Sequence, residues 1–313
     1  MAEACARLPW AERTPNAAGL AMLAGLGGAP LSAGYRPLDG FWTFVARAGL
    51  EPDSALERRL PGLRRLGARP YGILGDSHGR HLIRRGQRHG TWLAPLAHLA
   101  SSASARGLGR ADGRSGTGPK VAAALERLLA IDDLPILMKF GQVDIEFVQV
   151  FKRLAAGEDR FSPEAFDAFA DETIALYVAF LAGVVPAAQR SRVRVLSLFP
   201  PALSDDSWRE GYLNAHMVAV HGPPDTGDLT ARLGRLDIPN LAQRTALHAA
   251  FNERLQAAVE VEGFRWGDDF SPWLGGDGLL DPAWLGPAAG RDHHLDLPAA
   301  RWRALDWLWP ILE

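Results

Sequence analysis

The stretch Tyr71-Gly72-Ile73-Leu74-Gly75-Asp76-Ser77-His78 decides the fold predicted for this chain. Residues 70–74 form a short apolar run that favours a buried strand, and a glycine follows the run. Asp76 and Ser77 are residue types that favour a helix start, and the next apolar residues continue in a helical pattern. The stretch therefore predicts a strand, a tight turn and a helix, with the serine hydroxyl at the turn.

The same alternation of elements continues along the chain. Further apolar runs predict strands at residues 92–99, 134–140, 192–199 and 264–270. Helical patterns predict helices at residues 120–129, 162–181, 240–260 and 298–312. Strands that alternate with helices imply an α/β fold with a mostly parallel sheet of about five strands and helices on both faces. Ligands bind beyond the carboxyl ends of the strands in such sheets.

The overall composition limits the classes of partner. The 313 residues carry a formal net charge of −2, which gives no electrostatic reason to expect a nucleic acid. Cys5 is the only cysteine, so no intrachain disulfide can form. The apolar stretch 17–34 contains glycines and a proline and is predicted to pack on the domain rather than to act as a signal peptide. We expect no membrane span and a cytoplasmic protein.

One large domain accounts for most of the chain. Residues 1–66 are predicted to form a helical or irregular lead-in packed on an α/β domain at residues 67–313. Residues 202–238 have no regular pattern, and we expect them to form an insertion over one end of the sheet.

Three short motifs follow predicted strands or lie near the C-terminus. The first is Gly75-Asp76-Ser77-His78, the second Gly141-Gln142-Val143-Asp144, and the third Asp292-His293-His294-Leu295-Asp296. A serine at a helix start can act as a nucleophile, with the backbone N–H groups of that start facing a developing oxyanion. A histidine beside a carboxylate can act as a general base. Taken singly, the first motif is equally well a helix cap, and the third could be a metal site or an ordinary polar loop.

Taken together and in this order, the three motifs resemble the blocks of the SGNH/GDSL hydrolases. Gly75-Asp76-Ser77 matches the first block, and Gly141-Gln142-Val143-Asp144 matches the Gly-x-Asn-Asp block except that Val143 replaces the asparagine. The C-terminal loop matches the Asp-x-x-His block with altered spacing. The resemblance implies a flavodoxin-like three-layer αβα sandwich and a serine esterase, lipase or carbohydrate deacetylase.

A bacterial SGNH-like subgroup is more similar still, because it carries Gly-Asp-Ser-His, Ser-Ala-x-Gly-Leu and Phe-Gly-Glu-Val-Asp blocks. The second of these matches Ser104-Ala105-Arg106-Gly107-Leu108. The resemblance implies an oxyanion hole made by the N–H groups of Ser77 and Gly107, with Gly109 as the fallback. Gln142 is the nearest replacement for the missing asparagine. Contacts to substrate are expected from four further motif residues: Asp76, His78, Gly141 and Asp144.

The chemistry predicted from these residues is hydrolysis of an acyl or O-acetyl ester, possibly on a carbohydrate. Ser77 is the expected nucleophile, His294 the base and Asp292 its orienting acid, with His293 as the alternative base. In an extended loop Asp292 and His294 would face one side and His293 the other. No metal and no cofactor is expected. The alternatives are an acyltransferase acting on a glycan with the same serine, and a catalytically weak protein that binds a glycan or a partner.

Two further groups of residues could line the site. His78 and His81 lie three residues apart and so share one helix face, where they could line the pocket or bind a metal, and we expect them to be partly exposed polar residues of the helix. Trp208, Trp273 and Trp284 fall in predicted loops and are candidates for substrate contact. Trp302 and Trp309 follow the spacing of a buried helix face, so we expect them to pack in the core.

Overall fold

The computed structural model describes most of the chain from residue 60 onward. The described residues are 60–62, 64–84, 87–88, 91–100, 103–110, 116–212, 231–285, 290–295 and 297–312. Almost all of the predicted lead-in, and residues 213–230 of the predicted insertion, lie outside these ranges.

A single sheet organises the described residues, with the strand order β2-β3-β1-β4-β5-β6. Its strands are β1 (Ala68–Gly75), β2 (Gln87–Arg88), β3 (Thr91–Leu99), β4 (Ile136–Lys139), β5 (Val193–Leu196) and β6 (Arg265–Gly267). The strands from β3 to β6 pair in parallel, and the two-residue edge strand β2 is antiparallel to β3. The five parallel strands are numbered first to fifth along the chain, and they lie side by side in the order second, first, third, fourth, fifth. This is the flavodoxin-like order.

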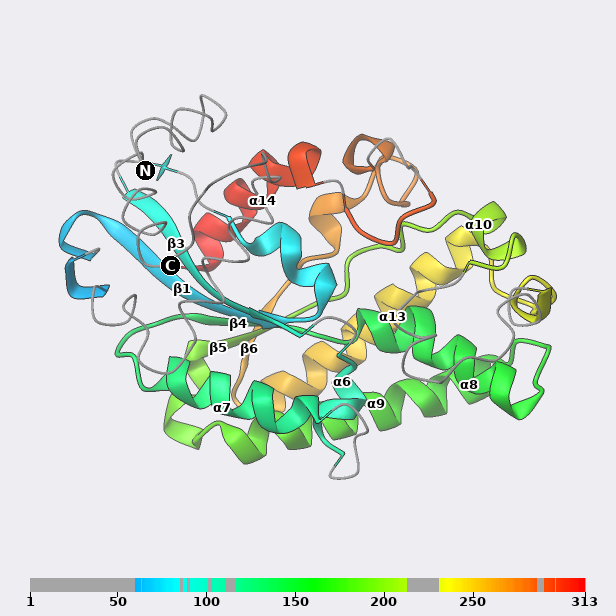
Figure 1. The fold of residues 1–313 in the computed structure, drawn as a ribbon, viewed down its shortest axis with the longest axis horizontal. Coiled ribbons are helices and arrows are strands. Elements are labelled where there is room, and N and C mark those ends of the chain that lie inside the picture. The colour runs from blue at the N-terminus through cyan, green and yellow to red at the C-terminus, as the bar shows by residue number, and fades with distance from the viewer. Residues whose placement is uncertain are drawn as a thin grey trace, which may run out of the picture.

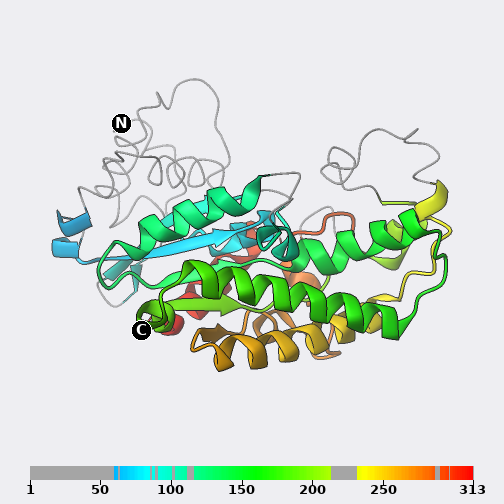
Figure 2. The ribbon, with the colours of Figure 1, turned by 90° about the horizontal axis from the view of Figure 1, so that it is seen from below.

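Helices cover both faces of the sheet, as Figures 1 and 2 show. The α-helices are α6 (Ala105–Leu108), α7 (Thr117–Leu129), α8 (Gln149–Ala156), α9 (Pro163–Val184), α10 (Asp205–Arg209), α13 (Leu241–Val261) and α14 (Leu297–Ile311). The 3₁₀ segments are η1 (Ser77–Leu82), η3 (Ala187–Arg192), η4 (Ser271–Trp273) and η5 (Pro282–Trp284), and η2 (Asp144–Val148) is a π-helical turn. In Figure 1, α14 and η1 lie on one side of the sheet, and α7 and α9 lie on the other.

The fold predicted from the sequence is confirmed. Each of the five long strands lies within or overlaps its predicted range, and the sheet is mostly parallel between helical layers. The long helices also match, and α13 begins with the reciprocal side-chain and backbone hydrogen bonds of Asn240 and Gln243. The helix predicted after Ser77 is a short 3₁₀ segment instead, in keeping with the low helix propensity of Gly79 within it.

The centre of the sheet brings two of the three sequence motifs close together. Strand β1 lies between β3 and β4, so the chain crosses to the other side of β1 when it passes from β3 to β4. A side chain at Gly75 would lie 2.7 Å from the carbonyl oxygen of Lys139, so the ends of β1 and β4 approach very closely. Ser77 follows β1 and Gly141 follows β4, which places both at the switch point where ligands bind in open α/β sheets.

No helix within the described ranges is both long enough and apolar enough to cross a membrane.

Candidate active site

The turn after β1 fixes the position of Ser77. Asp76 caps η1, because its Oδ1 accepts the N–H of His78 at 2.8 Å. Ser77 is the first residue of η1 and is only partly buried. The first N–H groups of a helix have no partner within the helix. The N–H of Ser77 is one of these groups, and it lies at the same end of η1 as the serine hydroxyl. The site thus combines a reachable hydroxyl with the positive end of a helical segment.

The C-terminal loop supplies a histidine and a carboxylate to this serine. His294 Nε2 lies 3.0 Å from Ser77 Oγ, although the two residues are 217 positions apart in the sequence. On the other side of the ring, His294 Nδ1 lies 2.8 Å from Asp292 Oδ1. The structure therefore brings Ser77, His294 and Asp292 into one continuous chain of contacts.

The loop is bent rather than extended at this point. Asp292 Oδ1 also accepts the backbone N–H of His294 at 3.1 Å, which closes a local turn of the Asx type. As a result His293 and His294 do not face opposite sides, and their ring centroids lie 3.9 Å apart. The alternation expected from an extended loop is wrong, yet Asp292 still reaches His294 because the contact is made within the turn.

The electrostatics of the loop suit a general base. The hydrogen bond from His294 holds the pKa of Asp292 at about 2, so Asp292 is ionised near neutral pH. An ionised carboxylate on Nδ1 keeps the proton there and leaves Nε2 free to accept one. Burial, together with the neighbouring His78 and His294, lowers the pKa of His293 to about 2, so that ring is neutral.

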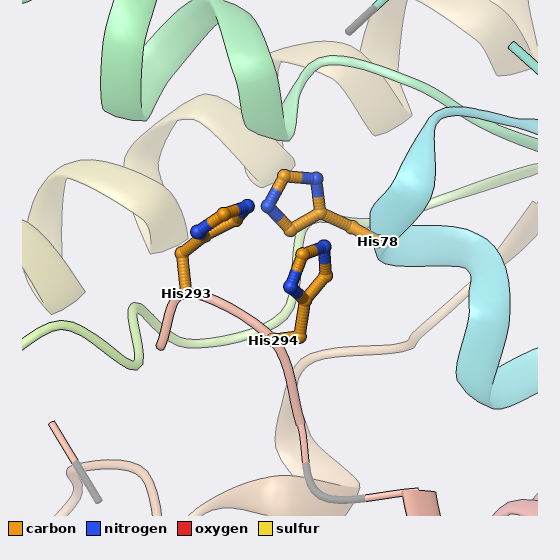
Figure 3. A group of neighbouring side chains, drawn as sticks. All are labelled: His78, His293 and His294. Carbon is orange, nitrogen blue, oxygen red and sulfur yellow. The ribbon is translucent and has the colours of Figure 1, made fainter. Parts of the chain in front are cut away.

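A third histidine lies beside these two. His78 Nδ1 is 2.8 Å from Asp76 Oδ1, and both residues are almost fully buried. Burial raises the pKa of Asp76 to about 6, and burial together with nearby charges lowers that of His78 well below its usual value. Asp76 is fully enclosed and its Oδ1 bonds the backbone and the ring of His78, whereas the ring of His78 lies beside His294, so the substrate contacts predicted for the two residues stay predictions. Figure 3 shows the rings of His78, His293 and His294 facing one another.

Tyr212 is a part of the site that the sequence motifs did not reveal. Its hydroxyl lies 2.6 Å from His293 Nδ1, and its ring stands near Phe147 and Trp208. The residue follows α10 at the described edge of the predicted insertion. No sequence motif includes Tyr212. Its position in the predicted insertion at residues 202–238 was the only feature of the sequence that could have suggested a place near the site.

The predicted oxyanion donor Gly107 is already engaged. Its N–H donates to Ser104 Oγ at 3.0 Å, because Ser104 caps α6. The fallback, Gly109, is a packing residue, since a side chain there would lie 2.5 Å from the carbonyl oxygen of Leu176. The N–H of Gly107 is thus engaged in the capping of α6, and the oxyanion role of the Ser77 N–H stays a prediction.

Gln142 is also fully engaged. Its amide nitrogen donates to Glu146 Oε1 at 2.7 Å and to the Phe199 carbonyl at 3.1 Å, while its oxygen accepts the Phe199 N–H at 3.1 Å. Gln142 is completely buried. Val143, at the position of the missing asparagine, is almost completely buried. The hydrogen-bonding groups of Gln142 join the loop after β5 to η2, and its predicted role in place of the asparagine stays a prediction.

The other two residues predicted to bind substrate also have structural roles. Asp144 is fully buried and accepts the backbone N–H groups of Ala105 at 2.6 Å and Arg106 at 3.4 Å, so it anchors the start of α6. Burial raises its pKa to about 7 despite these bonds. Gly141 has a φ of 111° and lies against Leu198 and Phe251 in the core. Neither residue is placed to contact substrate.

His81 belongs to a separate buried cluster. Its Nε2 lies 3.0 Å from Asp269 Oδ1, and the ammonium of Lys139 lies 2.7 Å from Asp269 Oδ2. Trp273 Nε1 donates to the same carboxylate at 2.9 Å. All of these groups are buried, so the partial exposure expected for His78 and His81 is wrong.

The tryptophans divide differently from the prediction. Trp208 and Trp273, expected in loops facing substrate, are buried in two small apolar clusters. Trp284 is partly buried at the edge of the second of these. Trp302, expected in the core, is 57% exposed on α14. Helical spacing alone could not distinguish the covered face of α14 from the open one.

The chain was compared with known families, curated proteins and solved structures. No family model matches the sequence, and no curated protein matches it. Among solved structures, a protein described as an acylhydrolase from Bacteroides fragilis aligns over 84% of this chain and 97% of its own, at 11% identity and a TM-score of 0.38. An extracellular lipase from Streptomyces rimosus aligns over 78% and 97%, at 17% identity and a TM-score of 0.41.

Proposed function

We propose that the protein is a serine-dependent ester hydrolase of the SGNH kind. The observation that carries this proposal is the chain of contacts from Ser77 Oγ through His294 to Asp292, with distances of 3.0 and 2.8 Å. The chain of contacts joins two segments that are 217 positions apart at the switch point of the sheet, where a ligand is expected. A hydroxyl, a base and an orienting carboxylate in this order form the constellation used for acyl transfer on several unrelated folds.

The residues divide the reaction into two steps. In the first, Ser77 Oγ attacks the acyl carbonyl while His294 Nε2 takes the hydroxyl proton, and His294 then returns the proton to the departing alcohol. In the second, water gives a proton to His294 and attacks the acyl-serine, and His294 then returns this proton to Ser77 Oγ as the bond to the acyl group breaks, which releases the acid and restores the serine. Asp292 holds the ring and stabilises its cationic form. The N–H of Ser77 donates to the oxyanion in both steps.

The oxyanion donors limit the proposed activity. Gly107 and Gln142 are engaged with Ser104, Glu146 and Phe199, and one lost donor costs about 3–4 kcal/mol of transition-state stabilisation. We therefore expect slow turnover and a preference for esters with good leaving groups. The proposed substrates are small acyl esters, including O-acetyl groups on a sugar.

The same observation favours a second candidate, a catalytically weak protein that binds a glycan or a partner. This candidate differs from the ester hydrolase in that no acyl group would be transferred to Ser77. A hydrolase that uses an added alcohol or sugar as acceptor in place of water would instead be an acyltransferase, and product analysis would reveal it.

A fluorophosphonate probe tests the proposal directly. Intact mass is expected to show one adduct per chain, mapped by peptide analysis to Ser77 and absent from Ser77→Ala. Ser271→Ala serves as the matched control, because Ser271 is exposed on η4 away from the motifs, and it should label like the unmodified protein. An unlabelled protein, or an adduct on another serine, would exclude the proposed nucleophile.

A further inference from the structure

The rings of His78, His293 and His294 converge on one point (Figure 3). One nitrogen from each ring lies within 4.8 Å of the others. The ring centroids are 5.1 Å apart for His78 and His293, and 5.0 Å apart for His78 and His294. Three imidazoles from two segments that are distant in the sequence are thus gathered in one place.

Each of these rings is held from behind by an oxygen atom. The Nδ1 atoms of His78, His293 and His294 contact Asp76 at 2.8 Å, Tyr212 at 2.6 Å and Asp292 at 2.8 Å respectively. Each oxygen fixes the orientation of its ring. The carboxylates of Asp76 and Asp292 accept from Nδ1 and leave the opposite nitrogen of His78 and His294 with its lone pair, and a Tyr212 hydroxyl that accepts from His293 Nδ1 does the same for His293. Histidines that bind metals almost always have this kind of partner on the other nitrogen.

The inward face of the cluster lacks a partner for His78. His78 Nε2 is buried and has no hydrogen-bond partner within the described residues, which is costly for a polar atom in the interior. The two carboxylates behind the rings, Asp76 and Asp292, can balance the charge of a divalent cation. A cation at the centre would therefore satisfy His78 and complement the local charge.

We propose that His78, His293 and His294 bind a zinc-class divalent metal ion, with the fourth position left to water. Imidazole nitrogens favour zinc and related transition metals over magnesium and calcium. Around tetrahedral zinc, with Zn–N bonds of about 2.1 Å, ligand nitrogens lie about 3.4 Å apart. Binding therefore draws the loop of His293 and His294 toward His78 by on the order of 1 Å.

The metal site and the proposed esterase site share one atom. His294 Nε2 contacts Ser77 Oγ, and its single lone pair can either accept the serine proton or bind the metal. This step rests on the proposed function: when the metal is bound to His294, Ser77 cannot act as a nucleophile. Zinc would then act as a reversible inhibitor held by the same loop that supplies the base.

Metal binding is measured first and without reference to activity. The full chain, freed of metal with a chelator, is titrated with zinc by calorimetry and with cobalt by visible absorption. One ion per chain and a four-coordinate cobalt spectrum are expected. His78→Gln and His293→Gln should each lower the affinity at least tenfold, and Tyr212→Phe should lower it less because Tyr212 acts through His293. His98→Gln, which removes a histidine of β3 outside the cluster, should bind zinc like the unmodified protein.

The second measurement links the metal to the serine. Zinc should slow fluorophosphonate labelling of Ser77 at least tenfold, and the ratio of rates with and without zinc should approach one in His78→Gln. Absence of stoichiometric zinc binding, or affinity unchanged in both His78→Gln and His293→Gln, would overturn the metal site. Labelling that is unaffected or accelerated by bound zinc would overturn the competition. Failure to label the metal-free protein would instead count against the esterase proposal and leave the binding result standing.

Discussion

Two of the histidine–aspartate pairs near Ser77, His294–Asp292 and His81–Asp269, have very different surroundings. His294 contacts Asp292 at 2.8 Å, and His81 contacts Asp269 at 3.0 Å. The side chain of Asp292 is 56% exposed, whereas that of Asp269 is fully buried. Proximity of a histidine to a carboxylate therefore does not by itself identify a catalytic pair.

The second ring nitrogen separates the two pairs. His294 Nε2 faces a serine hydroxyl, which can give up a proton. His81 has acceptors on both sides, since its Nδ1 lies 2.8 Å from the carbonyl oxygen of His78 and its Nε2 meets Asp269. Asp269 in turn neutralises the buried ammonium of Lys139. On the proposed function the exposed pair moves a proton, whereas the buried pair and Lys139 join η1 and β4 to the loop after β6.

The largest expected effect is on catalysis at the exposed pair. His294→Ala should lower kcat/KM for an aryl ester by on the order of 10⁴-fold or more, about as much as Ser77→Ala, because triad members act as a unit. His293→Ala should retain a substantial fraction and change mainly the affinity for substrate. The measurement is steady-state kinetics on chelator-treated protein, with folding checked by circular dichroism. A dead His293→Ala beside an active His294→Ala would reverse the assignment of the base.

The next effect is on stability at the buried pair. Asp269→Asn leaves the Lys139 ammonium buried without its counter-charge, so the free energy of unfolding should fall by about 3–5 kcal/mol. Asp292→Asn, at a half-exposed position, should change that free energy by no more than about 0.5 kcal/mol. It should nevertheless lower kcat/KM, although less than His294→Ala does. Urea unfolding and ester kinetics on both variants measure this, and equal losses of stability would remove the distinction between the pairs.

The sequence predicted the fold because strand and helix patterns depend on many residues at once. Five apolar runs separated by helical patterns imply a parallel sheet whichever single residue is misjudged. The contact between Ser77 and the C-terminal loop could also be predicted from the sequence, because the order of motifs places both at one edge of such a sheet. The catalytic role of this contact stays a prediction.

The individual donors could not be predicted in the same way. Whether the N–H of Gly107 faces a substrate depends on one competing bond, and Ser104 takes it by capping α6. Gln142 is likewise committed by the position of Phe199, which no local pattern reveals. The pairing of His81 with Asp269 joins residues 188 positions apart. Such outcomes are fixed by tertiary packing, and single motifs carry little information about them.

The smallest expected effect distinguishes the two carboxylates in acid. Burial alone would raise the pKa of Asp269, but His81 and Lys139 outweigh it and lower the pKa to about 2. Because the folded pKa lies below the unfolded value of about 3.9, the resulting stability is fully present above about pH 4 and is lost as the pH falls toward 2. The pKa of Asp292 is also lowered to about 2, but its half-exposed position screens the interaction and leaves little stability to lose.

The test is the difference in unfolding free energy between the unmodified protein and each variant, measured in urea from pH 7 to pH 2. Titration of groups common to both proteins, including Asp76 and Asp144, cancels in this difference where the sites do not interact. For Asp269→Asn the difference should shrink by about 2 kcal/mol between pH 4 and pH 2, as Asp269 takes up a proton and the two proteins become alike. For Asp292→Asn it should stay within about 0.5 kcal/mol throughout. A difference for Asp269→Asn that does not change with pH would mean that the carboxylate is not ionised beside Lys139, and the contrast between the two pairs would then rest on exposure alone.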